Sequence, residues 1–252
     1  PENDGELAFS LENFENLKLV FDLIYNPLRT NLLLRAEALG IPVMNGLEML
    51  VEQARETQKR FFKDYEPPLT PSLVDSVRRT ITNVTLIGLP FSGKSHFGRL
   101  LKDRLDKPLI DIDQSVEDAE GAPIHAIFQK KGETFFRTLE EAKVIEAAKR
   151  YNQIIAPGGG IILNEKAMRT LRQNSVIIFL DLKLDLIDPD FMKNRPLAAT
   201  PEDLEKLKRN RQSLYRKYAD YVIDKDTWDE DTILRRIEEA LNEYFDSERS
   251  ES

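Results

Sequence analysis

Short apolar runs alternate with longer amphipathic stretches along most of this chain. Runs rich in Val, Ile and Leu predict strands at residues 84–87, 109–112, 153–156, 176–180 and 221–223. The amphipathic stretches between these runs predict helices. Strands that read as continuous apolar runs are buried on both faces, so the pattern predicts a five-stranded parallel sheet with helices on both faces. Such sheets bind ligands at the carboxyl ends of their strands.

Residues 1–66 follow a different pattern. A β-like run at 17–24 precedes two predicted helices, over 31–39 and about 47–62, and Thr30 has the residue type of a helix cap. One strand and two helices bury little apolar surface, which makes a marginal independent core. We therefore expect this segment to be the end of something larger.

Prolines mark the boundary between the two parts of the chain. Pro67, Pro68 and Pro71 lie close together and disfavour helix on both sides. The sequence therefore predicts a proline-rich linker over residues 67–80 and a second domain over 81–252.

A phosphate-loop pattern follows the first predicted strand of the second domain. The pattern G-x-x-x-x-G-K-S is met by Gly88-Leu89-Pro90-Phe91-Ser92-Gly93-Lys94-Ser95. Main-chain N–H groups and the following helix attract phosphate, the lysine reaches the terminal oxygens, and the serine hydroxyl serves Mg²⁺. We expect ATP to bind through Gly88, Ser92, Gly93, Lys94, Ser95 and His96.

Two further predicted strand ends carry unusual residues. Asp111 and Asp113 put alternate carboxylates at the end of the second strand, where one can serve a metal and the other a substrate hydroxyl. Taken alone, this pattern is more often a helix cap or a solvated turn. The glycines at 158–160 follow the third strand and suit a close approach of main chain to a ligand, although a plain loop is the alternative.

Two arginines are further candidates. Arg137 lies among aromatic residues, where a guanidinium pairs with a carboxylate of either a substrate or the protein. Arg195 lies in Asn194-Arg195-Pro196-Leu197, ahead of a predicted helix, which fits a lid that carries a cation over a transferring phosphoryl group. Most other basic residues near Arg195 fit a solvated helix face.

Composition and charge exclude several classes of protein. The 252 residues carry a formal net charge of -8, which argues against a nucleic-acid partner. The absence of cysteine excludes disulfides and thiolate metal sites. No apolar run approaches the roughly 18 residues that span a bilayer, and the acidic start is unlike a signal peptide. We expect a cytoplasmic protein with no membrane partner.

At residues 82–245 the chain resembles shikimate kinase. The resemblance rests on the phosphate loop, Leu109-Ile110-Asp111-Ile112-Asp113, Gly132-Glu133-x-x-Phe136-Arg137-x-x-Glu140, Gly158-Gly159-Gly160, Arg195-Pro196-Leu197 and Arg211-x-x-Leu214-Tyr215. It implies an α/β P-loop kinase fold with a lid, and a kinase domain that is monomeric. It also implies ATP-dependent phosphorylation of the 3-hydroxyl of shikimate.

The resemblance also implies roles for particular residues. Shikimate would be held by Asp113, Arg137, Gly158, Gly159 and Arg211, with the arginines on its carboxylate. Ser95 and Asp111 would serve Mg²⁺, and Lys94 with Arg195 would neutralise the γ-phosphoryl group. Asp113 would orient, and could deprotonate, the attacking hydroxyl.

The first segment resembles the carboxyl-terminal part of shikimate dehydrogenase. The residues concerned are Asp22-Leu23-Ile24-Tyr25-Asn26-Pro27-Leu28-x-Thr30 and Asn45-Gly46-Leu47-x-Met49-Leu50-x-x-Gln53-Ala54. The resemblance implies a small α/β fragment of a nucleotide-binding domain, with Tyr25 and Gln53 facing shikimate and Gly46 and Met49 near nicotinamide. We expect no hydride transfer by this chain alone, and a segment that docks intramolecularly or belongs to a larger bifunctional chain.

Two functions remain open from the sequence. The favoured one is an ATP:shikimate 3-phosphotransferase. The alternative is a non-catalytic remnant that binds shikimate or a partner, because Phe91, His96 and Ala156 stand where the family usually has glycine, threonine and serine.

Overall fold

The computed structural model describes residues 9–62, 68–187, 200–227 and 229–250. Its centre is a five-stranded, wholly parallel sheet of strand order β4-β5-β3-β6-β7. The strands are β3 (Asn83–Ile87), β4 (Leu109–Asp111), β5 (Ile154–Ala156), β6 (Ser175–Leu182) and β7 (Tyr221–Lys225). The predicted parallel sheet is confirmed, and each strand coincides with one of the apolar runs.

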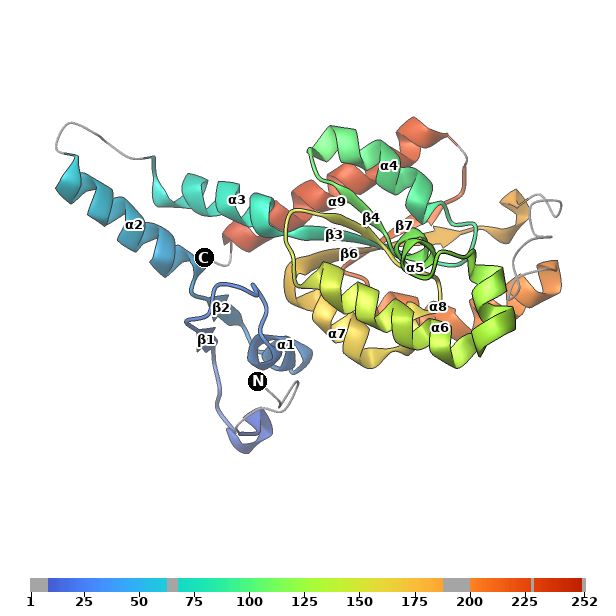
Figure 1. The fold of residues 1–252 in the computed structure, drawn as a ribbon. Helices are drawn as coiled ribbons and strands as arrows, with labels where there is room; N and C mark the ends of the chain where they lie inside the picture. The colour runs from blue at the N-terminus through green and yellow to red at the C-terminus, as the bar shows by residue number, and fades with distance from the viewer. Residues whose placement is uncertain (1–8, 63–67, 188–199, 228, 251–252) are drawn as a thin grey trace.

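Helices cover both faces of this sheet (Figure 1). On one face α4 (Lys94–Leu105) and α9 (Glu230–Ser250) pack on β3 and β6 around Leu86 and Ile178. On the other face lie α5 (Ile112–Glu120), α6 (Ile124–Ala148), α7 (Glu165–Asn174) and α8 (Pro201–Tyr218). In β3, β5 and β6, alternate side chains pack into the hydrophobic clusters on the two faces, because successive side chains point to opposite faces. Short 3-10 turns are η1 (Leu11–Asn13), η2 (Ile161–Leu163) and η3 (Leu184–Leu186).

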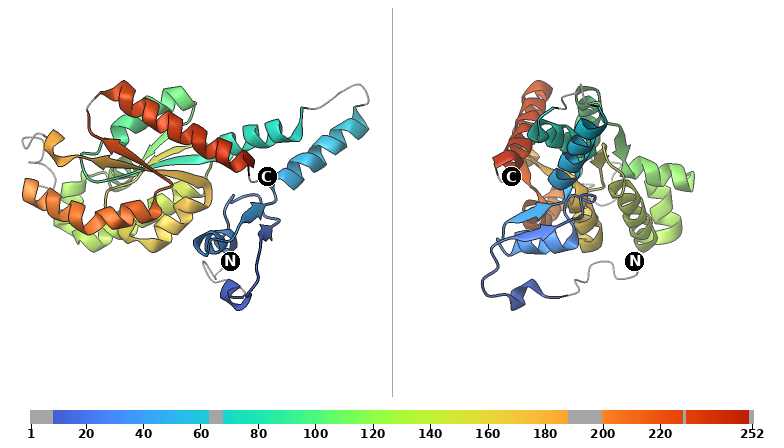
Figure 2. Two further views of the ribbon diagram at one scale, coloured as in Figure 1. Left: turned by 180° about the vertical axis from the view of Figure 1, so that it is seen from behind. Right: turned by 90° about the vertical axis from the view of Figure 1, so that its left-hand side faces the viewer.

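The first segment is a smaller α/β unit at the end of the molecule away from the carboxyl ends of the central strands (Figures 1 and 2). It contains β1 (Val20–Asp22), α1 (Asn31–Ala38), β2 (Val43–Asn45) and α2 (Leu47–Phe61). Thr30 caps α1 as predicted, its hydroxyl accepting a hydrogen bond from the Leu33 N–H. The prediction of a single strand is wrong, since β2 pairs in parallel with β1. Strand β2 is too short and too exposed to show an apolar run.

The segment predicted as a linker is largely helical. Helix α3 spans Thr70–Ile81 and packs against α2 through a cluster that contains Leu47, Val51 and Val74. Pro71 lies in its first turn, where the main-chain N–H has no partner within the helix, so a proline there removes no hydrogen bond. The expectation that the prolines disfavour helix on both sides is therefore wrong for residues 70–80.

Hydrogen bonds join the first segment to the larger domain beside the amino end of β6. The Leu28 N–H donates to Asn174 Oδ1 at 2.8 Å. The Arg29 guanidinium donates to the Ser175 main-chain oxygen at 2.6 Å and forms an ion pair with Asp220 at 3.4 Å. These contacts lie at the opposite edge of the sheet from the phosphate loop.

Candidate active site

The carboxyl edge of the sheet brings most of the predicted site residues together. The phosphate loop follows β3, Asp111 ends β4, and the glycines at 158–160 follow β5. A Cβ atom added to Gly159 would lie 3.0 Å from the main-chain oxygen of Gly88, so the glycine run packs directly on the phosphate loop. The structure therefore makes one site from two motifs that are about seventy residues apart in the sequence.

The phosphate loop is built mainly from main chain. Gly93 precedes α4 in a left-handed conformation with φ +86°, and Phe91 is also left-handed with φ +68°. A left-handed conformation costs a residue with a side chain about 1 to 2 kcal/mol, a cost that glycine avoids. The partly buried Phe91 ring packs against the hydrophobic cluster that contains Leu89 and Phe179. The ring thus adds to the core, while the loop main chain carries strain.

The polar groups of the loop contact its own carbonyls. Lys94 Nζ donates hydrogen bonds to the main-chain oxygens of Gly88 and Leu89, at 3.0 and 2.9 Å. Ser92 is fully buried, and its hydroxyl has no hydrogen-bond partner among the described residues. Lys225 Nζ donates to the Ser92 main-chain oxygen at 3.1 Å. Two lysines therefore fix the loop.

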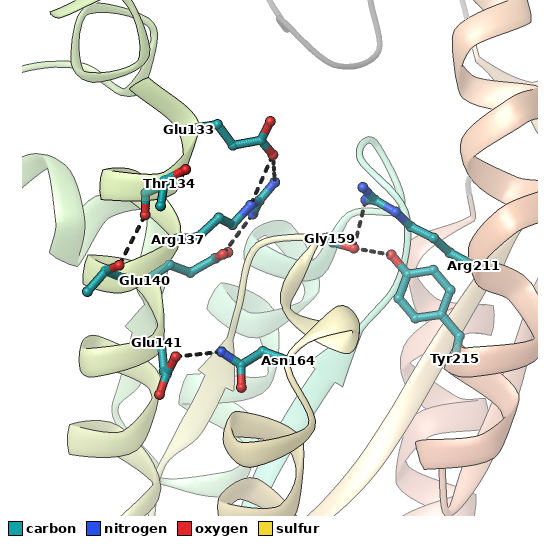
Figure 3. A network of polar contacts seen from close by, with 10 residues as sticks. Glu133, Thr134, Arg137, Glu140, Glu141, Gly159, Asn164, Arg211 and Tyr215 are labelled. Carbon is teal, nitrogen blue, oxygen red and sulfur yellow. Dashed lines mark hydrogen bonds and ion pairs between the residues drawn. The ribbon is translucent and has the colours of Figure 1, made fainter. Parts of the chain in front are cut away.

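Arg137 is held on α6 by two carboxylates (Figure 3). Its guanidinium donates to Glu140 at 2.7 Å and to Glu133 at 3.1 Å. Gly132 breaks the helix with φ +81° and ψ 168° just before Glu133, so the second half of α6 carries all three charged residues. Burial alone would lower the pKa of Arg137, but the charges of Glu140 and Glu133 outweigh it and raise that pKa. Arg137 is thus a fixed cation.

Glu140 is a buried carboxylate, only 1% exposed. Burial raises its pKa above the ordinary value, the Arg137 charge opposes that shift, and the charge of Asp113 adds to it. Its Oε1 atom has no hydrogen-bond partner among the residues that the structure describes. The Glu140 carboxylate has therefore lost its hydration on burial, and its ion pair with Arg137 holds that guanidinium in position.

A second cation stands on the other side of the glycine run, on α8. Arg211 and the Tyr215 hydroxyl both donate to the main-chain oxygen of Gly159, at 3.1 and 2.6 Å (Figure 3). The Tyr215 ring stacks on Phe179 with centroids 4.8 Å apart. Burial raises the pKa of Tyr215, so this hydroxyl stays protonated and remains a donor.

The three glycines leave room for these side chains. A Cβ atom on Gly158 would collide with Glu140 Oε1 and lie 3.0 Å from Asp113 Oδ1. A Cβ atom on Gly160 would collide with the Arg137 guanidinium. The glycines are therefore required by the close approach of side chains from α5 and α6. Contact of this run with a ligand stays a prediction.

The two aspartates have different surroundings. Asp111 caps α5, its carboxylate accepting a hydrogen bond from the Gln114 N–H at 3.3 Å. Asp113 lies in the first turn of α5, close to both Gly158 and Glu140. Asp113 therefore faces the glycine run.

The His96 side chain lies on the surface between α4 and α9. Its half-exposed ring contacts Glu230 at the start of α9, with Nε2 2.7 Å from Oε1. The side chain thus pairs with protein, although its position in the first turn of α4 still offers a main-chain N–H to an anion. Arg195 lies outside the described residues.

Ser95 and Asp111 fit a Mg²⁺ ion that is held largely by substrate phosphate and water. Within the described ranges no cluster of three or more His, Cys, Asp or Glu residues could hold a metal alone. Mg²⁺ in phosphoryl-transfer sites ordinarily takes one or two protein oxygens and keeps several waters. A hydroxyl at the start of α4 and a carboxylate at the end of β4 meet that requirement.

Three residues of the site were not assigned from the sequence. Glu140 and Tyr215 lie within the quoted motifs, but their burial and their partners Arg137 and Gly159 appear only in the fold. Lys225 follows an apolar run at the carboxyl end of the last strand. A lysine at that position was a signal, because ligands bind such sheets at the carboxyl ends of their strands.

Comparison with known proteins identifies the family. The sequence profile of the family described as shikimate kinase matches residues 90–242. The chain belongs to the shikimate kinase family. Shikimate kinase of Caldanaerobacter subterraneus subsp. tengcongensis is 39% identical over 169 residues, which cover 65% of this chain and 96% of that relative. Shikimate kinase of Moorella thermoacetica is 34% identical, with 66% and 97% covered.

Solved shikimate kinases share the fold. The Acinetobacter baumannii enzyme, solved in complex with shikimate, has a TM-score of 0.63 and 29% identity, covering 68% of this chain and 98% of that one. Shikimate kinase of Aquifex aeolicus gives 0.56 and 28%, with 64% and 96% covered. The predicted α/β kinase fold is confirmed, and the profile match leaves residues 1–89 outside it. No helix of the described part is both long and apolar enough to cross a membrane.

Proposed function

We propose that this shikimate kinase family member transfers the γ-phosphoryl group of ATP to the 3-hydroxyl of shikimate. One observation carries the proposal: the glycine run that packs on the phosphate loop is flanked by two fixed guanidinium groups, Arg137 and Arg211. A triphosphate in the loop would therefore lie beside two cations suited to the carboxylate of a small acid.

The residues divide the chemistry between them. Arg137 and Arg211 bind the acceptor carboxylate, which fixes the ring relative to the glycine run. Asp113 accepts a hydrogen bond from the attacking hydroxyl and takes its proton as the bond to phosphorus forms. Lys94 neutralises charge on the transferred group, and Arg195 is proposed to assist it.

Mg²⁺ would be held by Ser95 and Asp111, and when bound it supplies charge neutralisation to the phosphate oxygens. The cap hydrogen bond from Gln114 orients the Asp111 carboxylate at the strand end. Main-chain N–H groups of the phosphate loop and the first turn of α4 would cradle the phosphates.

A coupled assay of ADP formation tests the function. We expect ADP release from Mg·ATP to depend on shikimate and to be absent with gluconate, an acyclic hydroxy acid that matches the carboxylate but not the ring. Measurement of shikimate binding by calorimetry separates the rival: a non-catalytic remnant would bind shikimate and show no turnover at saturating substrates. That result would reject the proposed activity.

For residues 1–66 we propose a structure derived from the end of a shikimate dehydrogenase nucleotide-binding domain, docked on the kinase domain of a monomer. The parallel β1–β2 pair with α1 supports it, as does Gly46, where a Cβ atom would collide with the Leu23 main chain. Tyr25 and Met49 are exposed at 45% and 40%. We expect no NADP⁺-dependent oxidation of shikimate by this chain, and detectable NADPH formation would contradict that expectation.

A further inference from the structure

Lys225 is a fully buried lysine at the carboxyl end of β7, where its side chain is 0% exposed. Its Nζ donates a hydrogen bond to the Ser92 main-chain oxygen at 3.1 Å and lies 5.0 Å from the centre of the Phe97 ring. Burial of a lysine among strands and helices costs free energy, because the ammonium loses its hydration. Contacts of the ammonium must offset this cost, and the hydrogen bond from Lys225 is made to the phosphate loop.

The ammonium lies directly behind the turn that opens α4. A Cβ atom added to Gly93 would be 3.0 Å from Lys225 Nζ, so the lysine lies against the glycine that precedes Lys94. The carbonyl of Ser92 accepts the hydrogen bond from Lys225. In a phosphate loop, carbonyls that point outward leave the neighbouring N–H groups free to point inward, toward the ligand.

We propose that Lys225 is a positioning residue for the nucleotide: it holds the Ser92 carbonyl away from the cradle and places a second positive charge behind the phosphates. The inference rests on the proposed function, because it assumes that a polyphosphate occupies the loop. The proposal is also supported by Phe91, whose backbone is left-handed at a position where the family usually has glycine. This strained loop needs contacts that hold its conformation. The hydrogen bond from β7 is one restraint that holds it.

Nucleotide binding should then be linked to protonation. Burial, and next the charge of Lys94, lower the pKa of Lys225 to about 8. A bound triphosphate would raise this pKa again, since negative charge favours the ammonium. Affinity is therefore full below pH 8 and falls as the pH rises through the pKa of the free protein, where binding must take up a proton.

Other charged groups near β7 are engaged elsewhere. Asp181 of β6 pairs with Lys208 and Arg216 of α8. Asp226, which follows Lys225, pairs with Arg236 of α9. On α4, His96 pairs with Glu230, and Lys94 is the charge that acts on the pKa of Lys225.

Lys107 provides a matched control. It is also buried, at 8% exposed, and burial lowers its pKa to about 8 as well. Its Nζ donates to the main-chain oxygens of Arg79 and Thr82, beside the amino end of β3 and away from the phosphate loop. Removal of its charge should affect stability without affecting nucleotide binding.

Calorimetry with Mg·ADP and with the β,γ-imido analogue of ATP tests the proposal in the full chain. For Lys225→Met we expect affinity to fall about tenfold near pH 7, with shikimate affinity unchanged. Lys225→Arg should keep most of the affinity and lose its decline above about pH 8, because arginine stays charged. Titrations near pH 8.5 in two buffers of different ionisation enthalpy should show proton uptake by the wild type and by Lys107→Met, and none by either Lys225 variant.

The possible failures differ. If the wild type binds nucleotide and both Lys225 variants bind it with unchanged affinity and unchanged proton uptake, the role of Lys225 is wrong and the proposed function stands. If Lys107→Met loses as much affinity as Lys225→Met, the effect is one of general stability and the proposal is overturned. If the wild type binds shikimate but no nucleotide, both the proposal and the kinase function fail. Lys225→Arg keeps the test decisive should the methionine variant not fold.

Discussion

The acceptor side and the nucleotide side of this site are built in different ways. On the acceptor side, side chains hold side chains: Glu133 and Glu140 fix Arg137, and Arg211 shares the Gly159 oxygen with Tyr215. On the nucleotide side, the loop is main chain that is restrained by lysines contacting its carbonyls.

This difference predicts how each side responds to substitution. An acceptor site with several polar contacts loses affinity in steps, because each contact contributes separately. A phosphate loop binds through many main-chain N–H groups and depends on one catalytic lysine, so most of its rate enhancement rests on a single side chain. The effects below should therefore separate into changes of shikimate affinity and changes of nucleotide use.

The largest effect is expected for Lys94→Ala. Removal of the ammonium that neutralises the transferred group should lower kcat about a thousandfold. Shikimate affinity, measured by calorimetry, should stay within about twofold, since Lys94 does not belong to the acceptor side. Lys102→Ala, on the same helix away from the loop, is the control. A variant at Lys94 that retains wild-type ADP production would show that the loop does not bind the reacting phosphate.

A smaller loss is expected for Arg137→Lys, in which the charge stays and the forked geometry is lost. Shikimate KM should rise about tenfold to a hundredfold, because a lysine cannot contact Glu140 and the ligand carboxylate together. The KM for ATP should be unchanged. Arg150→Lys removes the guanidinium of an exposed pair with Glu146 and should have no kinetic effect. Equal effects on both KM values would contradict separate binding sides.

Glu140→Gln should weaken shikimate binding without lowering the stability of the fold at neutral pH. The native state binds the Glu140 proton more tightly than the unfolded chain does, so this carboxyl favours folding at low pH and that contribution is lost as the pH rises through its raised pKa. At neutral pH the neutral glutamine should therefore match or exceed the wild-type melting temperature. Shikimate KM should rise about tenfold, because Arg137 loses a buried partner. A large drop in melting temperature together with unchanged KM would refute this role.

The smallest effect concerns Phe91. Phe91→Gly relieves about 1 kcal/mol of left-handed strain and should lower the KM for ATP about threefold, with shikimate KM unchanged. Phe91→Ala removes the ring but keeps the strain, so it should not improve the KM for ATP. If the alanine variant improves as much as the glycine variant, the ring and not the main chain limits nucleotide binding.

The central fold was predictable because its physical signal is local. Continuous apolar runs placed every strand of the central sheet, and the cap at Thr30 placed the start of α1. Strand β2 was missed because three partly exposed residues carry no apolar run. Helix α3 was missed because proline was read as a helix breaker, whereas Pro71 lies in the first turn, where it is tolerated.

Part of the site was predictable, because the residue types and spacing of its motifs indicate which ligands they bind. Arg137 and Arg211 both lie beside the glycine run, and the roles that the resemblance implies for them stay predictions. Glu140 and Lys225 were not assigned, because the burial of Glu140 against Gly158 and the contact of Lys225 with Ser92 join segments that are far apart in the sequence. The side-chain contact of His96 with Glu230 likewise depends on how α9 packs.

Product analysis in a single turnover tests most directly whether a phosphoryl group passes from ATP on the nucleotide side to shikimate on the acceptor side. The full chain in excess is mixed with Mg·ATP labelled in the γ-phosphoryl group and with shikimate, and the products are examined by phosphorus NMR. We predict that the label appears in a phosphate ester at the 3-hydroxyl, in amounts equal to the ADP formed. Label found only in inorganic phosphate, or only in unreacted ATP, would contradict phosphoryl transfer to shikimate at this site.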